Sequence, residues 1–221
     1  MRLSEFDAII FDNDGVLVDS EIIHVTVERE MLKEIGLAYS HETYLSRFVG
    51  LSMPDFYAEL DRDHWLKFGR AFPAGFDAEL VRRVWPRIEA ELQPISGASE
   101  LATRFQGLTA VASSAPSDRL TRKLEITGLK SLFEPRIYSS QAVQKGKPAP
   151  DLFLHAAAEL TAAPTNCVVI EDSENGVRAG RAAGMTVIGF TGGQHADPKL
   201  GDRLESAGAH CVVSSHAELL G

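Results

Sequence analysis

Cysteine and long apolar runs are both scarce in this chain. Only two cysteines occur among its 221 residues, Cys167 and Cys211, each beside valines in an apolar segment. Two such residues do not make a disulfide framework, so we expect small core side chains in a reduced protein. No apolar stretch approaches the roughly 18 residues that a membrane span needs, and residues 1–5 lack a signal-peptide pattern. These absences predict a cytoplasmic protein with no membrane partner.

Basic residues are also in deficit. Lysine and arginine total 22 against 31 aspartate and glutamate, which gives a formal net charge of −9. A nucleic-acid surface owes much of its affinity to Lys and Arg, so no nucleic-acid partner is expected. A small phosphorylated substrate remains compatible with this charge if a bound cation helps to hold it. The length suits one large domain or a core with a smaller insertion, and we expect a monomer, with an oligomer left open.

Apolar strands and helices alternate through the chain, except over residues 19–92. Outside that stretch, short apolar runs predict buried strands at 8–11, 108–112, 136–138, 167–170, 185–190 and 211–213. Helical patterns separate them, at 99–105, 117–127, 150–160 and 174–183. Strands that alternate with helices in this way favour a parallel sheet with helices on its faces.

Residues 19–92 carry helical patterns only. Four helices are expected, at 20–35, 41–48, 54–68 and 77–92. Ser20 is a candidate N-cap for the first, and Pro86 is expected to kink or split the last. We therefore predict an α/β fold with two domains. A Rossmann-like parallel-sheet core would comprise residues 1–18 and 93–221, and an α-helical cap of residues 19–92 would be inserted into it.

The first predicted strand ends in a pair of carboxylates. Asp12 and Asp14 follow its apolar run, and Gly15 comes directly after them. In open α/β sheets, ligands bind outside the carboxyl ends of the strands. Two neighbouring acids repel each other there unless a cation or a reaction uses them. Taken alone, the same residues could equally form an ordinary turn.

Polar residues also follow the later strands. Ser113 and Ser114 come after the second strand, Lys147 lies in the loop after the third, and Glu171 and Asp172 follow the fourth. Each has a plain explanation by itself, as a helix cap, a solvated loop or a helix start. Their coincidence at one edge of the predicted sheet indicates a shared site.

Together these side chains suit phosphoryl transfer. Asp12 is the expected nucleophile, because a carboxylate can attack phosphorus and form an aspartyl-phosphate. Asp14 is placed to protonate the leaving oxygen and then to deprotonate the attacking water. Ser113 would donate hydrogen bonds to the phosphoryl oxygens, and Lys147, with Lys145 as its rival, would offset their charge.

This chemistry also needs a cation, because a carboxylate and a phosphate repel each other. Mg²⁺ suits a site built from carboxylates and a substrate phosphate. Asp12 and Asp172 would supply ligands, with Glu171 as a further candidate. Mg²⁺ is therefore the expected cofactor.

These motifs resemble those of the haloacid dehalogenase-like hydrolase superfamily, and within it the β-phosphoglucomutase-like sugar-phosphate enzymes. Four motifs match in order: Asp12 to Gly15, Ser113, Lys147 with Pro148, and Glu171 with Asp172. The similarity covers essentially the whole chain. The resemblance implies a Rossmann-like sheet with a helical cap. It also implies the backbone carbonyl of Asp14 as a further Mg²⁺ ligand.

In that family the cap supplies the groups that select the substrate. Glu21, His24 and Arg47 are the cap-side candidates for substrate binding, and Ser113 and Ser114 are the candidates on the core. For Arg47 and His24, an ordinary helix residue without contact to substrate is the alternative. The resemblance implies a small phosphorylated substrate, either a sugar phosphate or a phosphorylated sugar acid.

The resemblance further implies a magnesium-dependent phosphatase, with a β-phosphoglucomutase-like phosphosugar mutase as the alternative. A dehalogenase would lack the second aspartate, and a non-catalytic phosphate binder would leave the catalytic set unexplained. A mutase is expected to grip its second phosphate with an Arg after the Gly-x-Ser of the cap and a Lys farther along. Here Met53 follows residues 50–52 and no Lys occurs at 76–79, although Arg82 and Arg83 could substitute. Hydrolysis is therefore expected.

Overall fold

The computed structural model describes residues 2–49, 51 and 53–220. Six strands form one sheet in the order β3-β2-β1-β4-β5-β6, and every neighbouring pair is parallel. Their bounds are β1 Ala8–Phe11, β2 Leu108–Ser113, β3 Ile137–Ser139, β4 Cys167–Glu171, β5 Thr186–Phe190 and β6 Cys211–Val213. The predicted Rossmann-like parallel sheet is confirmed, and each predicted strand lies within one residue of its observed bounds at either end.

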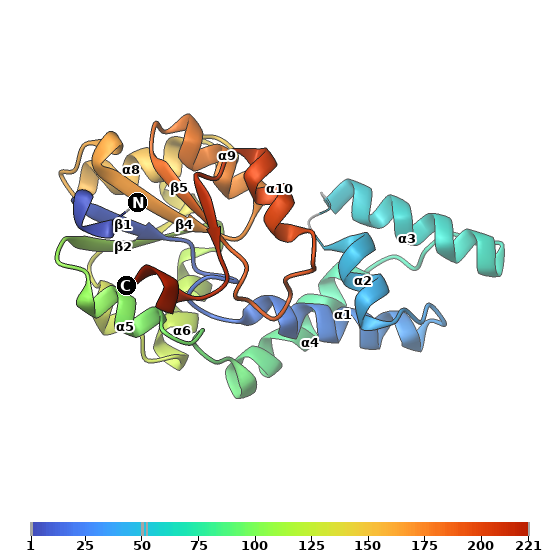
Figure 1. The fold of residues 1–221 in the computed structure, drawn as a ribbon. Coiled ribbons are helices and arrows are strands. Elements are labelled where there is room, and N and C mark those ends of the chain that lie inside the picture. Colours follow the sequence, from blue (N-terminus) through green and yellow to red (C-terminus); the bar gives the residue numbers. More distant parts are fainter. Residues whose placement is uncertain (1, 50, 52, 221) are drawn as a thin grey trace.

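Helices cover both faces of the sheet, because the side chains of β1 alternate between two apolar clusters. Ile9 and Phe11 belong to one cluster with residues of α5 Ala98–Arg104, α6 Ser117–Ile126 and α7 Lys130–Phe133. Ala8 and Ile10 belong to the other cluster, with residues of α8 Asp151–Glu159, α9 Glu174–Ala182 and α10 Leu200–Ala207. Figure 1 shows α8, α9 and α10 on one side of the sheet and α5 and α6 on the other. α7 and α10 were not predicted.

The stretch between β1 and α5 is helical, as expected from the sequence. It holds α1 Ser20–Glu34, α2 His41–Phe48, α3 Met53–Phe68 and α4 Phe76–Glu91, and its described residues include no strand. Figure 1 shows these helices to one side of the sheet.

Two local predictions in this helical part need correction. The alternative that Pro86 splits its helix is wrong, since Pro86 lies inside the single helix α4, in which Leu80, Val84 and Ile88 are buried. Ser20 is the first residue of α1 and not its cap, since Asp19 occupies the N-cap position. The Ser20 hydroxyl instead donates a hydrogen bond to Asp14.

Two neighbouring segments connect the helical part to the sheet. The backbone N–H of Asp19 donates to the carbonyl of Gln93 at 3.1 Å, and that of Ile95 donates to the carbonyl of Leu17 at 2.8 Å. The connections therefore run side by side at the end of the sheet where β1 finishes. Among the described residues, no helix is both long enough and apolar enough to cross a bilayer.

Candidate active site

The carboxyl ends of β1, β2 and β4 meet at one cavity. Asp12 comes directly after β1, Ser113 is the last residue of β2 and Glu171 is the last residue of β4. These residues and Ser114 line a cavity of about 380 Å³. A larger hollow of about 680 Å³ lies at the opposite, amino ends of β1 and β2, and it contains none of the predicted site residues. The polar strand ends are therefore brought together as the sequence predicts.

Lys147 links two of the strand ends. Its side chain is only 5% exposed, and its ammonium donates to Asp12 Oδ1 at 2.5 Å and to Glu171 Oε1 at 2.7 Å. It also donates to the backbone carbonyl of Ala112 at 3.0 Å. Burial alone would lower the pKa of Lys147, but the two carboxylates raise it above its ordinary value. Lys147 is therefore a fixed positive charge inside the site, whereas its rival Lys145 is exposed.

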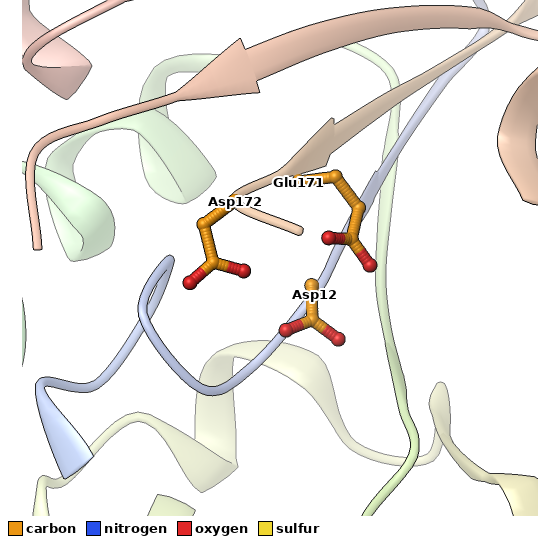
Figure 2. A group of neighbouring side chains, drawn as sticks. All are labelled: Asp12, Glu171 and Asp172. Atoms are coloured by element: carbon orange, nitrogen blue, oxygen red, sulfur yellow. The ribbon is translucent and has the colours of Figure 1, made fainter. Parts of the chain in front are cut away.

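Asp12, Glu171 and Asp172 form one buried acidic group. A ligand oxygen from each lies within 4.8 Å of the other two, and Figure 2 shows the three carboxylates facing a common space. Burial, opposed by Lys147 but reinforced by the neighbouring acids, raises the pKa of Asp12 well above its ordinary value. Burial also raises the pKa of Asp172 to about 6. An oxygen-only donor set with this excess of negative charge fits a hard divalent cation such as Mg²⁺.

Glu171 is the most firmly held of the three acids. While Oε1 accepts from Lys147, Oε2 accepts hydrogen bonds of 2.9 Å from both the backbone N–H and the hydroxyl of Ser173. A Cβ added at Gly176 would lie 1.7 Å from Glu171 Oε1, so the start of α9 must stay bare to admit the carboxylate. Glu171 therefore serves first as an anchor for Lys147, and Asp12 and Asp172 are the more available oxygen donors.

The Asp14 carboxylate lies outside this acidic group. Its Oδ1 accepts hydrogen bonds from the Lys123 ammonium of α6 and from the Ser20 hydroxyl at the start of α1. Burial works in the opposite direction, but Lys123 and Ser20 hold the pKa of Asp14 below its ordinary value. Sequence analysis missed Lys123, which reads as a surface lysine of an amphipathic helix although it is buried.

The cap-side candidates divide into two groups. Glu21 lines the cavity, and His24 lies close enough to Glu21 and Asp14 to interact with their charges, while burial lowers its pKa. Arg47 does not line the cavity. Its guanidinium forms ion pairs with Glu59 at 3.0 Å and with Asp63 at 2.9 Å, within the helical part itself.

The structure also places most of the residues considered for binding a second phosphate in a mutase. Gly50 and Ser52 of the cap motif lie outside the described residues, and the Leu51 between them lines the cavity. Arg82 and Arg83 both donate to Glu79 on their own helix, and neither lines the cavity.

The loop between β5 and α10 supplies residues that sequence analysis did not assign. His195 lies with its Nε2 3.1 Å from Asp172 Oδ2. Asp197 pairs with Arg203 of α10 at 2.6 Å, and Arg203 and Arg178 both pair with Glu174. Two glycines, at 192 and 193, precede His195 in the sequence, but no spacing in the sequence connects this loop to Asp172.

Comparison with known proteins agrees with this arrangement. The model of the haloacid dehalogenase-like hydrolase family matches residues 6–184. A 6-phosphogluconate phosphatase of Escherichia coli is 29% identical over 89% of this chain and 87% of its own length. A β-phosphoglucomutase of Bacillus subtilis is 30% identical over 89% of this chain and 87% of its own length.

Solved structures are similar over nearly the full length. A haloacid dehalogenase-like protein of unknown function from Agrobacterium tumefaciens superposes with a TM-score of 0.90 at 38% identity, covering 97% of this chain and 96% of that one. A HAD family hydrolase from Deinococcus radiodurans, with bound phosphate and sodium, has a TM-score of 0.83 at 36% identity and covers 98% and 94%. The chain belongs to the haloacid dehalogenase-like hydrolase family.

Proposed function

We propose that this protein is a magnesium-dependent phosphatase that hydrolyses a sugar phosphate or a phosphorylated sugar acid through an aspartyl-phosphate. The observation that carries the proposal is the buried group of Asp12, Glu171 and Asp172, with the Lys147 ammonium between Asp12 and Glu171. The phosphatase among the relatives and the phosphate in the Deinococcus hydrolase support the same chemistry.

In the first step an oxygen of Asp12 attacks the phosphorus, a P–O bond to Asp12 forms, and the P–O bond to the sugar oxygen breaks. Asp14 gives a proton to that leaving oxygen. In the second step Asp14 takes a proton from water, which attacks the phosphorus and releases inorganic phosphate and free Asp12. Lys147 offsets negative charge throughout, and Ser113 and Ser114 line the space for the phosphoryl oxygens.

Mg²⁺ would be held by Asp12 and Asp172, with Glu171 as the third acid of the group and the Asp14 backbone carbonyl as the further ligand that the family implies. When bound, the cation would neutralise charge on the phosphate and on the acids around it.

We further propose that residues 19–92 act as a cap that closes over the substrate, and that residues 1–18 and 93–221 form the core. The paired connections at Asp19 with Gln93 and at Leu17 with Ile95 give a narrow hinge. Val49 and Leu51 of the helical part already line the cavity beside the core residues. Closure there would exclude bulk water during the transfer to Asp12.

The charges around the cavity favour hydrolysis over the mutase reaction. A mutase must hold a second, non-transferring phosphate, which calls for a cation with no other partner. Each lysine, arginine and histidine side chain that lines the described cavity already pairs with a carboxylate: Lys147, Arg178, His195 and Arg203.

The same charges favour one of the two substrate classes. The described lining holds seven carboxylates and three lysine or arginine side chains. A substrate whose only anionic group is the transferred phosphate suits this lining better than one with an added carboxylate. We therefore expect the phosphate ester of an uncharged sugar to be turned over faster than a phosphorylated sugar acid.

The test is phosphate release from a panel of hexose phosphates, hexitol phosphates and 6-phosphogluconate, with Mg²⁺, with Ca²⁺ and with EDTA. Activity should require Mg²⁺, and Ca²⁺ should support it poorly because its looser coordination misplaces the attacking carboxylate. Full activity in EDTA would contradict the proposal. Conversion of β-glucose 1-phosphate to glucose 6-phosphate faster than phosphate release would assign the mutase instead.

A further inference from the structure

His195 occupies an unusual place beside the acidic group. It lies in the loop between β5 and α10, and only 5% of the residue is exposed. Its Nε2 is 3.1 Å from Asp172 Oδ2. Its Nδ1 is buried and has no hydrogen-bond partner among the described residues. The proposed phosphoryl transfer assigns this imidazole no role.

The backbone around His195 leaves a slot for its ring. A Cβ added at Gly193 would lie 2.7 Å from both Cε1 and Nδ1 of the ring. A Cβ added at Gly15, next to Asp14, would lie 2.7 Å from Cε1 and 1.8 Å from Asp172 Oδ2. Two glycines from distant parts of the chain therefore both have to lack a side chain for the ring to reach Asp172.

The ring engages one side of the Asp172 carboxylate only. Oδ2 faces His195, and within the described part of the chain no hydrogen bond engages Oδ1. Figure 2 shows one oxygen of Asp172 directed toward Asp12 and Glu171. A free carboxylate rotates about its last bond, so a donor that holds one oxygen also decides where the other one points.

We propose that His195 is a positioning residue for the metal site: its Nε2–H donates to Asp172 Oδ2 and thereby presents the other oxygen to the cation. The inference rests on the proposed function, because it assumes that Asp172 is a ligand of Mg²⁺. Partners that orient a metal ligand typically change metal affinity by about 10- to 100-fold when they are removed. The loss of His195 should therefore weaken Mg²⁺ binding without removing any ligand.

The first experiment measures Mg²⁺ binding by calorimetry, without substrate, for wild type, His195→Ala and His195→Asn. The Kd should rise about 10- to 100-fold for His195→Ala and less for His195→Asn, which keeps a donor. The Mg²⁺ concentration for half-maximal phosphatase activity should rise by the same factor. Gln194→Ala, an exposed change in the same loop, is the matched control and should bind as wild type does.

A double-mutant cycle tests independently whether the space left by Gly193 allows the His195 ring to reach Asp172. Gly193→Ala should push the ring away from Asp172 and raise the Kd for Mg²⁺, since Gly193 does not have the positive φ that would strain alanine. In the His195→Ala background the same change should have a much smaller effect, because the ring is gone and the Gly15 carbonyl oxygen, 3.2 Å from the added Cβ, is the closest contact left. Gly193→Ala also supplies the measurement if His195→Ala does not fold.

The outcomes separate the two proposals. If wild type binds no Mg²⁺ and releases no phosphate, the proposed function fails. If wild type binds Mg²⁺ and folded His195→Ala binds it within twofold of wild type, only the role of His195 fails. A Gly193→Ala effect of equal size in both backgrounds would also overturn that role.

Discussion

Lys147 offers the sharpest test of how this site is held together. Its ammonium lies 2.5 Å from Asp12 and 2.7 Å from Glu171, and its side chain is 5% exposed. The Coulomb attraction within each ion pair is about 6 kcal/mol at an effective dielectric constant of about 20. The cost of removing three charges from water cancels much of that attraction. Lys147→Met keeps the apolar length of the side chain but leaves the carboxylates without their counter-charge, which typically costs about 3–5 kcal/mol.

The loss should depend on pH. Burial already raises the pKa of Asp12, and without the opposing charge of Lys147 that pKa rises further, so the folded state binds the proton more tightly than the unfolded state does. The unfolding free energy of the variant then falls as pH rises. The deficit should therefore be larger near pH 8 than near pH 5. Mg²⁺ should restore part of it near pH 8, because a cation that binds only the folded state stabilises that state.

Thermal melting in EDTA, with and without added Mg²⁺, measures these effects. A loss of about 3–5 kcal/mol corresponds to about 6–20 °C in a chain of this size. Lys145→Met is the control, because Lys145 is exposed in the same loop, and its melting temperature should match wild type. A Lys147→Met protein as stable as wild type near pH 8 in EDTA would refute the view that this ammonium compensates the buried acids.

Asp12→Asn should lower phosphate release by several orders of magnitude while the melting temperature is kept, because an amide matches the carboxylate in shape but cannot attack phosphorus. Retention of a tenth of the wild-type rate would exclude Asp12 as the nucleophile. Burial raises the pKa of Glu28 from 4.5 to about 7, so the folded state binds the proton more tightly and the unfolding free energy falls between those pH values. Glu28→Gln should remove that fall, which amounts to at most about 3 kcal/mol at 1.36 kcal/mol per pH unit. Urea titrations at several pH values measure it. The prediction fails if Glu28→Gln keeps the wild-type dependence of unfolding free energy on pH, or if the exposed Glu30→Gln changes that dependence more. Lys123→Met should lower kcat by about tenfold or more with a smaller change in KM, since Asp14 loses the partner that positions it; a change confined to KM would place Lys123 in substrate binding.

The parts of the site that the sequence predicted are those with a local signal. An apolar run that ends in Asp12 and Asp14, and another that ends in Glu171 and Asp172, identify strand ends without knowledge of the fold. Parallel strands then bring those ends to one edge. The position of Lys147 also follows, because its loop leaves the same edge.

The parts that could not be predicted depend on contacts between distant segments. Arg47 had the charge for a phosphate, but Glu59 and Asp63 on a neighbouring helix bind its guanidinium. His195 reaches Asp172 only because Gly15 and Gly193 leave room for its ring. Neither relation has a spacing or a periodicity that a single sequence can reveal.

Asp14 shows why such distant contacts matter for the chemistry. Its carboxylate is held by Lys123, which belongs to the core, and by Ser20, which begins the first helix of the cap. In this arrangement the ammonium favours the ionised form of Asp14, which suits a base that takes a proton from water. The Ser20 hydroxyl also favours the ionised form, so the protonated form, which the leaving oxygen requires, becomes more favourable when either contact weakens. Because Ser20 lies directly beyond the hinge, a rotation of the cap would move one of the two groups that hold Asp14, and the two proton-transfer roles would then belong to different cap positions.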